Sequence, residues 1–137
     1  YNLTNNMLPK TAVKAIILNE DNKILLLQRN PQIRDTDNWD LPGGLVEQDE
    51  DPEQALRREV REETNLVIHL KSKATTWKFV RKLDNKTIQV QNYICTTNNS
   101  NIILSEEHVQ FKWIDLKDIK DYKVKDSSLY QSLLNSK

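Results

Sequence analysis

Cysteine and histidine are scarce in this chain of 137 residues. Cys95 is the only cysteine, so no disulfide can form within the chain, and we expect a reducing compartment, the cytoplasm. The two histidines, His69 and His108, are widely separated, and with a single cysteine they lack the spacing of a zinc site. Disulfide-stabilised scaffolds and structural zinc modules are therefore excluded.

The chain also lacks an excess of charge of either sign and any long apolar run. Lys and Arg together number 20, as do Asp and Glu, so the formal net charge is zero. Bulk electrostatics therefore favours neither nucleic acid nor an anionic membrane. No apolar run approaches the length of about 18 residues that is typical of a transmembrane helix. We expect no stable nucleic-acid partner and no membrane association.

The length of the chain predicts one domain over residues 1–137, with a flexible lead-in over residues 1–10. Because the chain begins with Tyr1 rather than Met, we expect its genetic start to lie upstream, and a removed signal segment stays open. Both a monomer and a homodimer are compatible with the sequence.

Glycine is far less frequent in this chain than its usual abundance of roughly 7%. The chain has two glycines, Gly43 and Gly44, and they are adjacent. Their pairing indicates a point where backbone freedom or a close backbone approach is needed. A run of acidic side chains follows within a short stretch, interrupted by three arginines (Arg57, Arg58 and Arg61). The acidic residues are Glu47, Asp49, Glu50, Asp51, Glu53, Glu59, Glu62 and Glu63.

The second half of this acidic stretch has the start and stop signals of a helix. Asp51 suits the N-cap, Pro52 suits the first helical position, and Gln54 completes a capping box. Asn65 suits the end of the helix, because Asn tolerates left-handed backbone angles better than most residues. Leu56 lies on the side of this helix that should pack on a sheet.

Acidic residues gather on one face of the predicted helix. At about 100° per residue, Glu59, Glu62 and Glu63 fall within one arc. Glu59 and Glu63 are four positions apart, so their charges repel each other and destabilise the helix. A hard cation such as Mg²⁺, bound between the two carboxylates, would offset this repulsion. The alternative is an ordinary solvent-exposed helix, since Arg57 and Arg58 each have an oppositely charged Glu four positions away.

Strand patterns flank the helix on both sides. Apolar and β-branched runs predict strands at 12–18, 24–28, 39–41, 66–70, 74–83, 86–96 and 111–114. The first two strands form a hairpin, as do those at 74–83 and 86–96. A helical turn at 116–119 and a C-terminal helix at 127–134 complete the pattern. This order predicts an α/β fold with one mixed sheet.

The stretch Gly44–Leu66 closely resembles the Nudix box, the signature of the Nudix hydrolase family. That signature is G-x5-E-x7-R-E-U-x-E-E-x-G-U, where U is a bulky aliphatic residue. It is matched by Gly44, Glu50, Arg58, Glu59, Val60, Glu62, Glu63 and Leu66. Two positions depart: Asn65 replaces the last Gly, and Asp49 stands where many members carry Gly. The resemblance implies an α/β/α sandwich, the Nudix fold, and a Mg²⁺- or Mn²⁺-dependent pyrophosphohydrolase.

The resemblance also implies roles for individual residues. The implied metal ligands are Glu59, Glu62, Glu63 and the carbonyl of Gly43. The residues implied to act in catalysis are Arg58, Glu59, Glu62 and Glu107. Arg58 would orient the glutamates, with Glu50 as its acidic partner, although Glu50 is also explained as a carboxylate at a helix start. Glu59 or a neighbour would help to deprotonate the attacking water.

The residues outside the box are assigned less narrowly. Glu107 is similar to a distal glutamate that some members use as a base; it is equally explained as a solvated loop charge, and Glu106 is the fallback. His108 is expected to be structural or on the surface. Candidate substrate-binding residues are Arg29, Trp77 and Phe79, although strand aromatics more often cover a sheet and loop arginines are usually solvated.

Nucleoside triphosphates are the predicted substrates, cleaved to a monophosphate and pyrophosphate in the manner of MutT-like members. The short chain, without the long N-terminal extension of many sugar-nucleotide members, favours this choice. An ADP-ribose or sugar-nucleotide pyrophosphatase is the alternative within the family. A module that senses nucleotides without cleaving them is the alternative from another class, and a charged adaptor with no ligand is a third.

Overall fold

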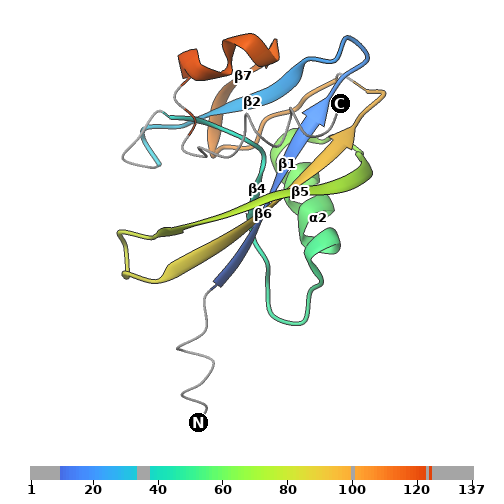
Figure 1. The fold of residues 1–137 in the computed structure, drawn as a ribbon. Helices are drawn as coiled ribbons and strands as arrows, with labels where there is room; N and C mark the ends of the chain where they lie inside the picture. The colour runs from blue at the N-terminus through green and yellow to red at the C-terminus, as the bar shows by residue number, and fades with distance from the viewer. Residues whose placement is uncertain (1–9, 34–37, 100, 123, 125–137) are drawn as a thin grey trace.

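The computed structural model describes residues 10–33, 38–99, 101–122 and 124. Within them lie a mixed β-sheet, one α-helix and one 3-10 helix (Figure 1). The strands are β1 (Lys10–Leu18), β2 (Ile24–Arg29), β3 (Trp39–Asp40), β4 (Gly43–Leu45), β5 (His69–Val80), β6 (Thr87–Thr96) and β7 (His108–Ile114). The helices are α2 (Pro52–Thr64) and the 3-10 helix η1 (Leu116–Tyr122).

The sheet is mixed, as the sequence predicts. Its main order is β3-β2-β1-β6-β5, with β4 paired to β1 and β7 paired to β2. β1 and β6 are parallel, and the other pairs are antiparallel. On β1, Val13 is opposite Gly44 on one side and Gln91 on the other. The paired glycines therefore lie against the central strand of the sheet.

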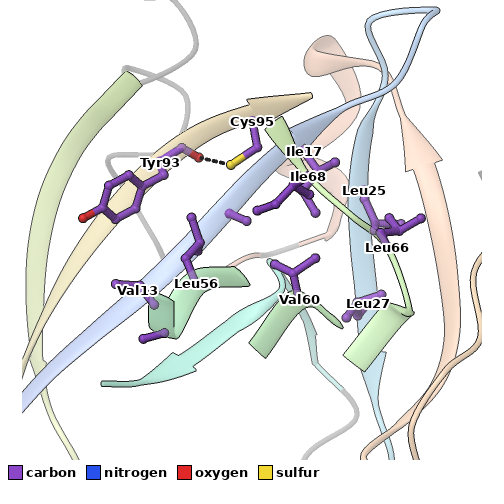
Figure 2. Packing of buried hydrophobic residues seen from close by; sticks show 12 residues of the cluster. Val13, Ile17, Leu25, Leu27, Leu56, Val60, Leu66, Ile68, Tyr93 and Cys95 are labelled. Carbon is purple, nitrogen blue, oxygen red and sulfur yellow. Dashed lines mark hydrogen bonds between the residues drawn. The ribbon is translucent and has the colours of Figure 1, made fainter. Parts of the chain in front are cut away.

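Alternating residues of β1 and β2 are buried on opposite faces of the sheet, because successive side chains of a strand point to opposite sides. Val13, Ile17 and Leu25 pack against Leu56 and Val60 of α2, as Figure 2 shows. The same cluster includes Leu66, Ile68, Tyr93 and Cys95. The predicted packing of α2 on the sheet is confirmed.

The opposite face of the sheet carries a second core. Ile16, Ile24 and Leu26 pack there with Ile114 and with Ile119 of η1. Trp39 packs at the edge of this core, with its ring edge-on to Tyr122 at 5.4 Å between centroids. Helical segments thus cover both faces of the sheet, in agreement with the α/β/α layering that the family resemblance implies.

The signals at both ends of α2 are confirmed. The Asp51 side chain accepts a hydrogen bond from the backbone N–H of Gln54, and the Gln54 side chain accepts one from the N–H of Asp51. Asn65 takes left-handed angles, φ 66° and ψ 12°, and its N–H donates to the carbonyl of Arg61. A capping box at one end and an Asn in the left-handed conformation at the other fix the length of this helix.

Several boundaries differ from the sequence prediction. The strands predicted at 66–70 and 74–83 are one strand, β5, which begins at His69. Its pairing with β6 shifts register between Leu70 and Ser72 and again between Lys73 and Thr76. These irregularities break the two-residue alternation that identifies a strand in sequence. The glycines lie in a short strand, β4, which the sequence did not predict, and Lys10, placed in the lead-in, begins β1.

Two further predictions fall outside the described residues: the remainder of the lead-in and the C-terminal helix at 127–134. Among the residues that are described, no helix is both long and apolar enough to span a bilayer.

Candidate active site

A cavity of about 320 Å³ opens where β1, β4, α2 and the start of β7 meet, and the β5–β6 hairpin forms one wall. It is lined by residues from six strands and one helix, together with the segments before β4, after β5 and before β7. They are Ala12, Lys14, Arg29, Leu41, Gly43, Gly44, Leu45, Glu59, Glu63, Phe79, Arg81, Ile88, Val90, Glu107 and His108. The cavity therefore combines carboxylates, cations and an apolar wall.

The two glycines let β4 approach the glutamates of α2 closely. The Gly43 N–H donates to Glu63 Oε1 at 2.9 Å. A Cβ on Gly44 would lie 2.6 Å from Cδ of Glu59 and 2.7 Å from each of its carboxylate oxygens. The Glu59 carboxylate thus occupies the space that any larger residue at position 44 would need.

Gly43 is required for a different reason. Its φ is +150°, and an added Cβ would lie 2.0 Å from the carbonyl oxygen of Val13. Since that oxygen belongs to the backbone of the central strand, it cannot move aside cheaply. The sequence predicted a close backbone approach at the paired glycines, and both glycines have one: Gly43 to the backbone of β1 and Gly44 to the side chain of Glu59.

Arg58 connects the acidic residues around the cavity. It donates to both oxygens of Glu50, from Nε at 2.7 Å and from Nη2 at 3.0 Å. It also donates from Nη1 to Glu59 at 3.0 Å and to Glu62 at 3.4 Å, and from Nη2 to the carbonyl of Leu45 at 3.3 Å. The bidentate bond lowers the pKa of Glu50 and raises that of Arg58. Arg58 therefore fixes the carboxylate of Glu59 relative to β4.

The carboxyl groups of Glu63 and Glu59 are destabilised in their charged forms. Burial raises the pKa of Glu63 to about 8, with repulsion from Glu59 and Glu107 adding to the shift, while Lys14 and the Gly43 N–H oppose it. Burial also raises the pKa of Glu59, against the opposing effect of Arg58. A bound cation would therefore stabilise the charged form of both carboxylates.

Glu107 and His108 approach these glutamates from the start of β7. Ligand atoms of Glu63, Glu107 and His108 lie within 4.8 Å of one another. Burial lowers the pKa of His108 to about 4, with help from the nearby charge of Arg29. His108, expected to be structural or on the surface, lines the cavity.

Two cations face the carboxylates from the sheet. Lys14 Nζ and Arg29 Nη2 donate to the same oxygen of Asp40, at 3.0 and 3.1 Å, and the Leu41 N–H donates to the other oxygen at 2.7 Å. Burial would raise the pKa of Asp40, but the two cations lower it overall. One anion between two cations leaves a net positive charge on this wall, which suits phosphate oxygens.

The apolar wall comes from the β5–β6 hairpin. Phe79 lines the cavity together with Ile88 and Val90, and Trp77 stacks on Phe79 with ring centroids 5.3 Å apart. Trp77 itself is not among the described lining residues, so its observed contact is with Phe79 and not with the cavity. A planar base fits such a surface.

The predicted site residues are mostly brought together. The cavity is lined by Gly43, Gly44, Glu59, Glu63, Glu107, Arg29 and Phe79, while Arg58 and Glu50 lie directly behind it. Glu62 is apart: its side chain is 59% exposed, and it reaches Arg58 rather than the described cavity lining.

The sequence prediction missed Lys14, Arg81 and the cavity position of His108. Lys14 is a single cation within an apolar strand and belongs to no recognisable motif. The only signal was the strand alternation, which places Lys14 on the face opposite to the residues that pack on α2. Arg81 follows β5 and pairs with Asp84 at 2.6 Å, a local turn contact that hides its place on the cavity. His108 adjoins Glu107, and that adjacency was the available signal.

The donor set fits a hard divalent cation. Carboxylate and carbonyl oxygens are the ligands that Mg²⁺ and Mn²⁺ prefer, and Glu59, Glu63 and Glu107 present carboxylates to one cavity. Glu63 is 7% exposed, and burying a carboxylate without a countercharge is costly. A cation bound there would remove that cost.

Comparison with known proteins agrees with this geometry. Residues 8–133 match the model of the NUDIX domain family. The chain is 31% identical over 126 residues to nucleoside triphosphatase NudI of Escherichia fergusonii, covering 85% of this chain and 89% of that protein. It is also 48% identical over 54 residues to the CTP pyrophosphohydrolase of Escherichia coli K12, although the match spans only 40% of that protein's length.

A solved structure gives the same result for the fold. The MutT protein from Methanosarcina mazei Go1 superposes with a TM-score of 0.79 at 28% identity, covering 92% of this chain and 91% of that one. The mixed sheet, with a carboxylate-bearing helix beside the paired glycines, agrees with the class that these matches indicate, the Nudix hydrolases. The chain belongs to the Nudix family.

Proposed function

We propose that this protein hydrolyses nucleoside triphosphates to a nucleoside monophosphate and pyrophosphate, and that the reaction depends on Mg²⁺ or Mn²⁺. One observation carries the proposal: a single cavity holds the carboxylates of Glu59 and Glu63, the cations Lys14 and Arg29, and the ring of Phe79. A polyphosphate and a planar base are complementary to such a surface. The relatives named as a nucleoside triphosphatase and a CTP pyrophosphohydrolase support the same substrate class.

The reaction adds water across a phosphoanhydride bond of the triphosphate, so that one P–O bond breaks and one forms. A divalent cation supplies charge neutralisation at the phosphate oxygens and lowers the pKa of water. Lys14 and Arg29 offset negative charge on the phosphates from the opposite wall of the cavity. The proton of the attacking water passes to a carboxylate, with Glu59 and Glu107 as the two candidates that line the cavity.

The remaining predicted roles belong to the same proposal. Arg58 holds Glu59 in place through the ion pair at 3.0 Å and is itself fixed by Glu50. Glu62 and the Gly43 carbonyl are proposed as further cation ligands. For Glu62 this requires its exposed side chain to leave Arg58 and turn toward the cavity.

The proposal includes the cellular setting. Cys95 is the only cysteine and is buried, and burial raises the pKa of its thiol to about 12, so the thiol is unreactive. A protein with one inert thiol and no disulfide is suited to the cytoplasm. The proposed partner is the nucleotide substrate, which would bind in the cavity. Both a monomer and a homodimer are compatible with the proposed function.

A substrate panel tests the proposal. It compares canonical and oxidised nucleoside triphosphates, ADP-ribose, a sugar nucleotide and a dinucleoside polyphosphate, each with Mg²⁺, with Mn²⁺ and with EDTA. We expect kcat/KM of about 10⁴ M⁻¹s⁻¹ or more for a nucleoside triphosphate, at least about tenfold above the other classes. A preference for ADP-ribose or the sugar nucleotide would select the alternative substrate. Tight binding of these compounds without cleavage would show a nucleotide-sensing module.

A further inference from the structure

We propose that His108 supplies an imidazole nitrogen to the divalent-cation site, beside the carboxylates of Glu63 and Glu107. This mixed set of ligands would favour Mn²⁺ or Co²⁺ over Mg²⁺. The inference concerns the cation of the proposed hydrolysis and so rests on that proposal. The ligands implied by the family signature are all oxygen donors, so a nitrogen ligand is a property of this chain.

The three side chains are already close enough to share one ion. One ligand atom from each of Glu63, Glu107 and His108 lies within 4.8 Å of the other two. Ligand atoms on an ion with bonds of about 2.1 Å are separated by roughly 3 to 4 Å, so small side-chain movements bring all three into range. The residues come from two elements far apart in sequence, α2 and the start of β7, and they meet at the cavity.

A ring nitrogen of His108 lacks a hydrogen-bond partner in the part of the chain that the structure describes. Nδ1 is buried and has no hydrogen-bond partner among the described residues. Buried polar atoms without a partner are uncommon and call for an explanation such as a bound ion. Since His108 lines the cavity, its imidazole is directed to the place where the carboxylates gather.

Backbone hydrogen bonds hold the segment before β7 against both neighbours. The Ser105 N–H donates to the carbonyl of Glu63 at 3.3 Å, which ties the segment to α2. On the other side, the Asn30 N–H donates to the carbonyl of Glu107 at 2.8 Å, and the Asn30 side chain donates to the carbonyl of Glu106 at 3.1 Å. The main chain that carries Glu107 and His108 is therefore fixed beside Glu63 before any ion binds, which favours ion binding.

The chemistry of the donors sets the preference between ions. Mg²⁺ selects oxygen ligands and keeps much of its water, whereas imidazole suits transition ions, whose affinity rises from Mn²⁺ to Co²⁺. Glu107 is exposed, so the site is open to ions from solvent. An ion that accepts both oxygen and nitrogen ligands gains the imidazole of His108 at this site, whereas Mg²⁺ binds imidazole only weakly.

Pulsed EPR of bound Mn²⁺ tests the inference directly. The full chain without a histidine tag is treated with EDTA, loaded with Mn²⁺ and examined for ¹⁴N coupling. His108→Gln is compared with His69→Gln, because His69 is the only other histidine and is exposed at the start of β5. We expect ¹⁴N coupling in the wild type and in His69→Gln and its loss in His108→Gln. The Kd for Mn²⁺ should rise about 10- to 100-fold in His108→Gln, and the Kd for Mg²⁺ less than about threefold.

The wild-type spectrum decides the matter even if His108→Gln fails to fold. Bound Mn²⁺ without ¹⁴N coupling would overturn the role of His108 and leave the proposed hydrolysis intact. Coupling that persists in folded His108→Gln would also overturn it. If the EDTA-treated wild type binds no Mn²⁺, the cation dependence of the proposed function fails as well, so the two failures are distinguishable.

Discussion

Glu63 combines burial, a backbone hydrogen bond from Gly43 and two acidic neighbours in one side chain. Without a cation, the folded protein favours its protonated form, because burial raises its pKa to about 8 from an ordinary value near 4.5. Between about pH 4.5 and pH 8, Glu63 binds a proton in the folded state but not in the unfolded state, and this difference stabilises the fold. That contribution is complete below about pH 4.5 and is lost as the pH rises through 8.

We therefore predict that the cation-free protein loses stability between about pH 5 and pH 8. The loss from Glu63 alone is on the order of 3 to 5 kcal/mol. Urea unfolding in EDTA at several pH values measures it. Glu63→Gln should remove most of this pH dependence, whereas Glu53→Gln, an exposed glutamate in the first turn of the same helix, should leave it unchanged. Equal pH profiles for the wild type and Glu63→Gln would contradict the assignment.

The adjacent glycines are predicted to respond differently to alanine. Gly44→Ala places a methyl group on the Glu59 carboxylate, which can swing away, so kcat/KM should fall about 100-fold or more with little loss of stability. Gly43→Ala places the methyl group on the backbone of β1, so it should cost more than about 3 kcal/mol or prevent folding. Thermal unfolding and steady-state kinetics of both variants separate the two effects. A Gly44→Ala enzyme of normal activity would show that Glu59 does not depend on this contact.

Individual residues differed in how far the sequence could place them. Gly44, Glu59 and Glu63 lie at fixed spacing within one motif, so their proximity could be predicted. Lys14 and Asp40 could not, because their ion pair joins β1 to β3 and depends on how the strands are ordered in the sheet. The cavity position of His108 likewise depends on the contact of its segment with α2 and Asn30.

At the level of elements, α2 is followed by a C-cap residue in the left-handed conformation. Asn65 has φ 66°, where the family signature has Gly. Since its side chain is exposed, replacing it removes little packing.

We predict that Asn65→Gly leaves the free energy of unfolding unchanged or raises it by up to about 1 kcal/mol. Asn65→Ala should lower it by about 1 kcal/mol, because Ala tolerates left-handed angles less well. Urea unfolding at one pH compares the two variants, and each serves as the control for the other. Equal stability of both would show that the backbone angle carries no cost.

The elements themselves were predictable where local chemistry specifies them. The capping box and Asn65 fixed the ends of α2, and alternation fixed the cores of β1 and β6. The extent of β5 could not be predicted, because its register shifts against β6 interrupt the alternation. The strand character of Gly43–Leu45 comes from pairing with β1, and glycine has no strand preference of its own that would signal it.

For the whole molecule, the site is assembled by topology. β1 is the central strand, parallel to β6 and flanked on its other side by β4 and β2, so it brings Lys14 to the glycines and the glycines to α2 (Figure 1). β7 pairs with the outer side of β2 and delivers Glu107 and His108 to the same cavity. The sequence supports a mixed sheet, but the order of strands that closes the cavity is known only from the structure.

The most direct test of the account is product analysis of one nucleoside triphosphate in the presence of Mg²⁺. We predict equimolar nucleoside monophosphate and pyrophosphate, no reaction in EDTA, and a rate at least about 100-fold lower for Glu59→Gln, with Glu53→Gln near the wild type. Circular dichroism verifies that both variants are folded. Formation of a nucleoside diphosphate and phosphate, turnover in EDTA, or full activity of Glu59→Gln would contradict the account.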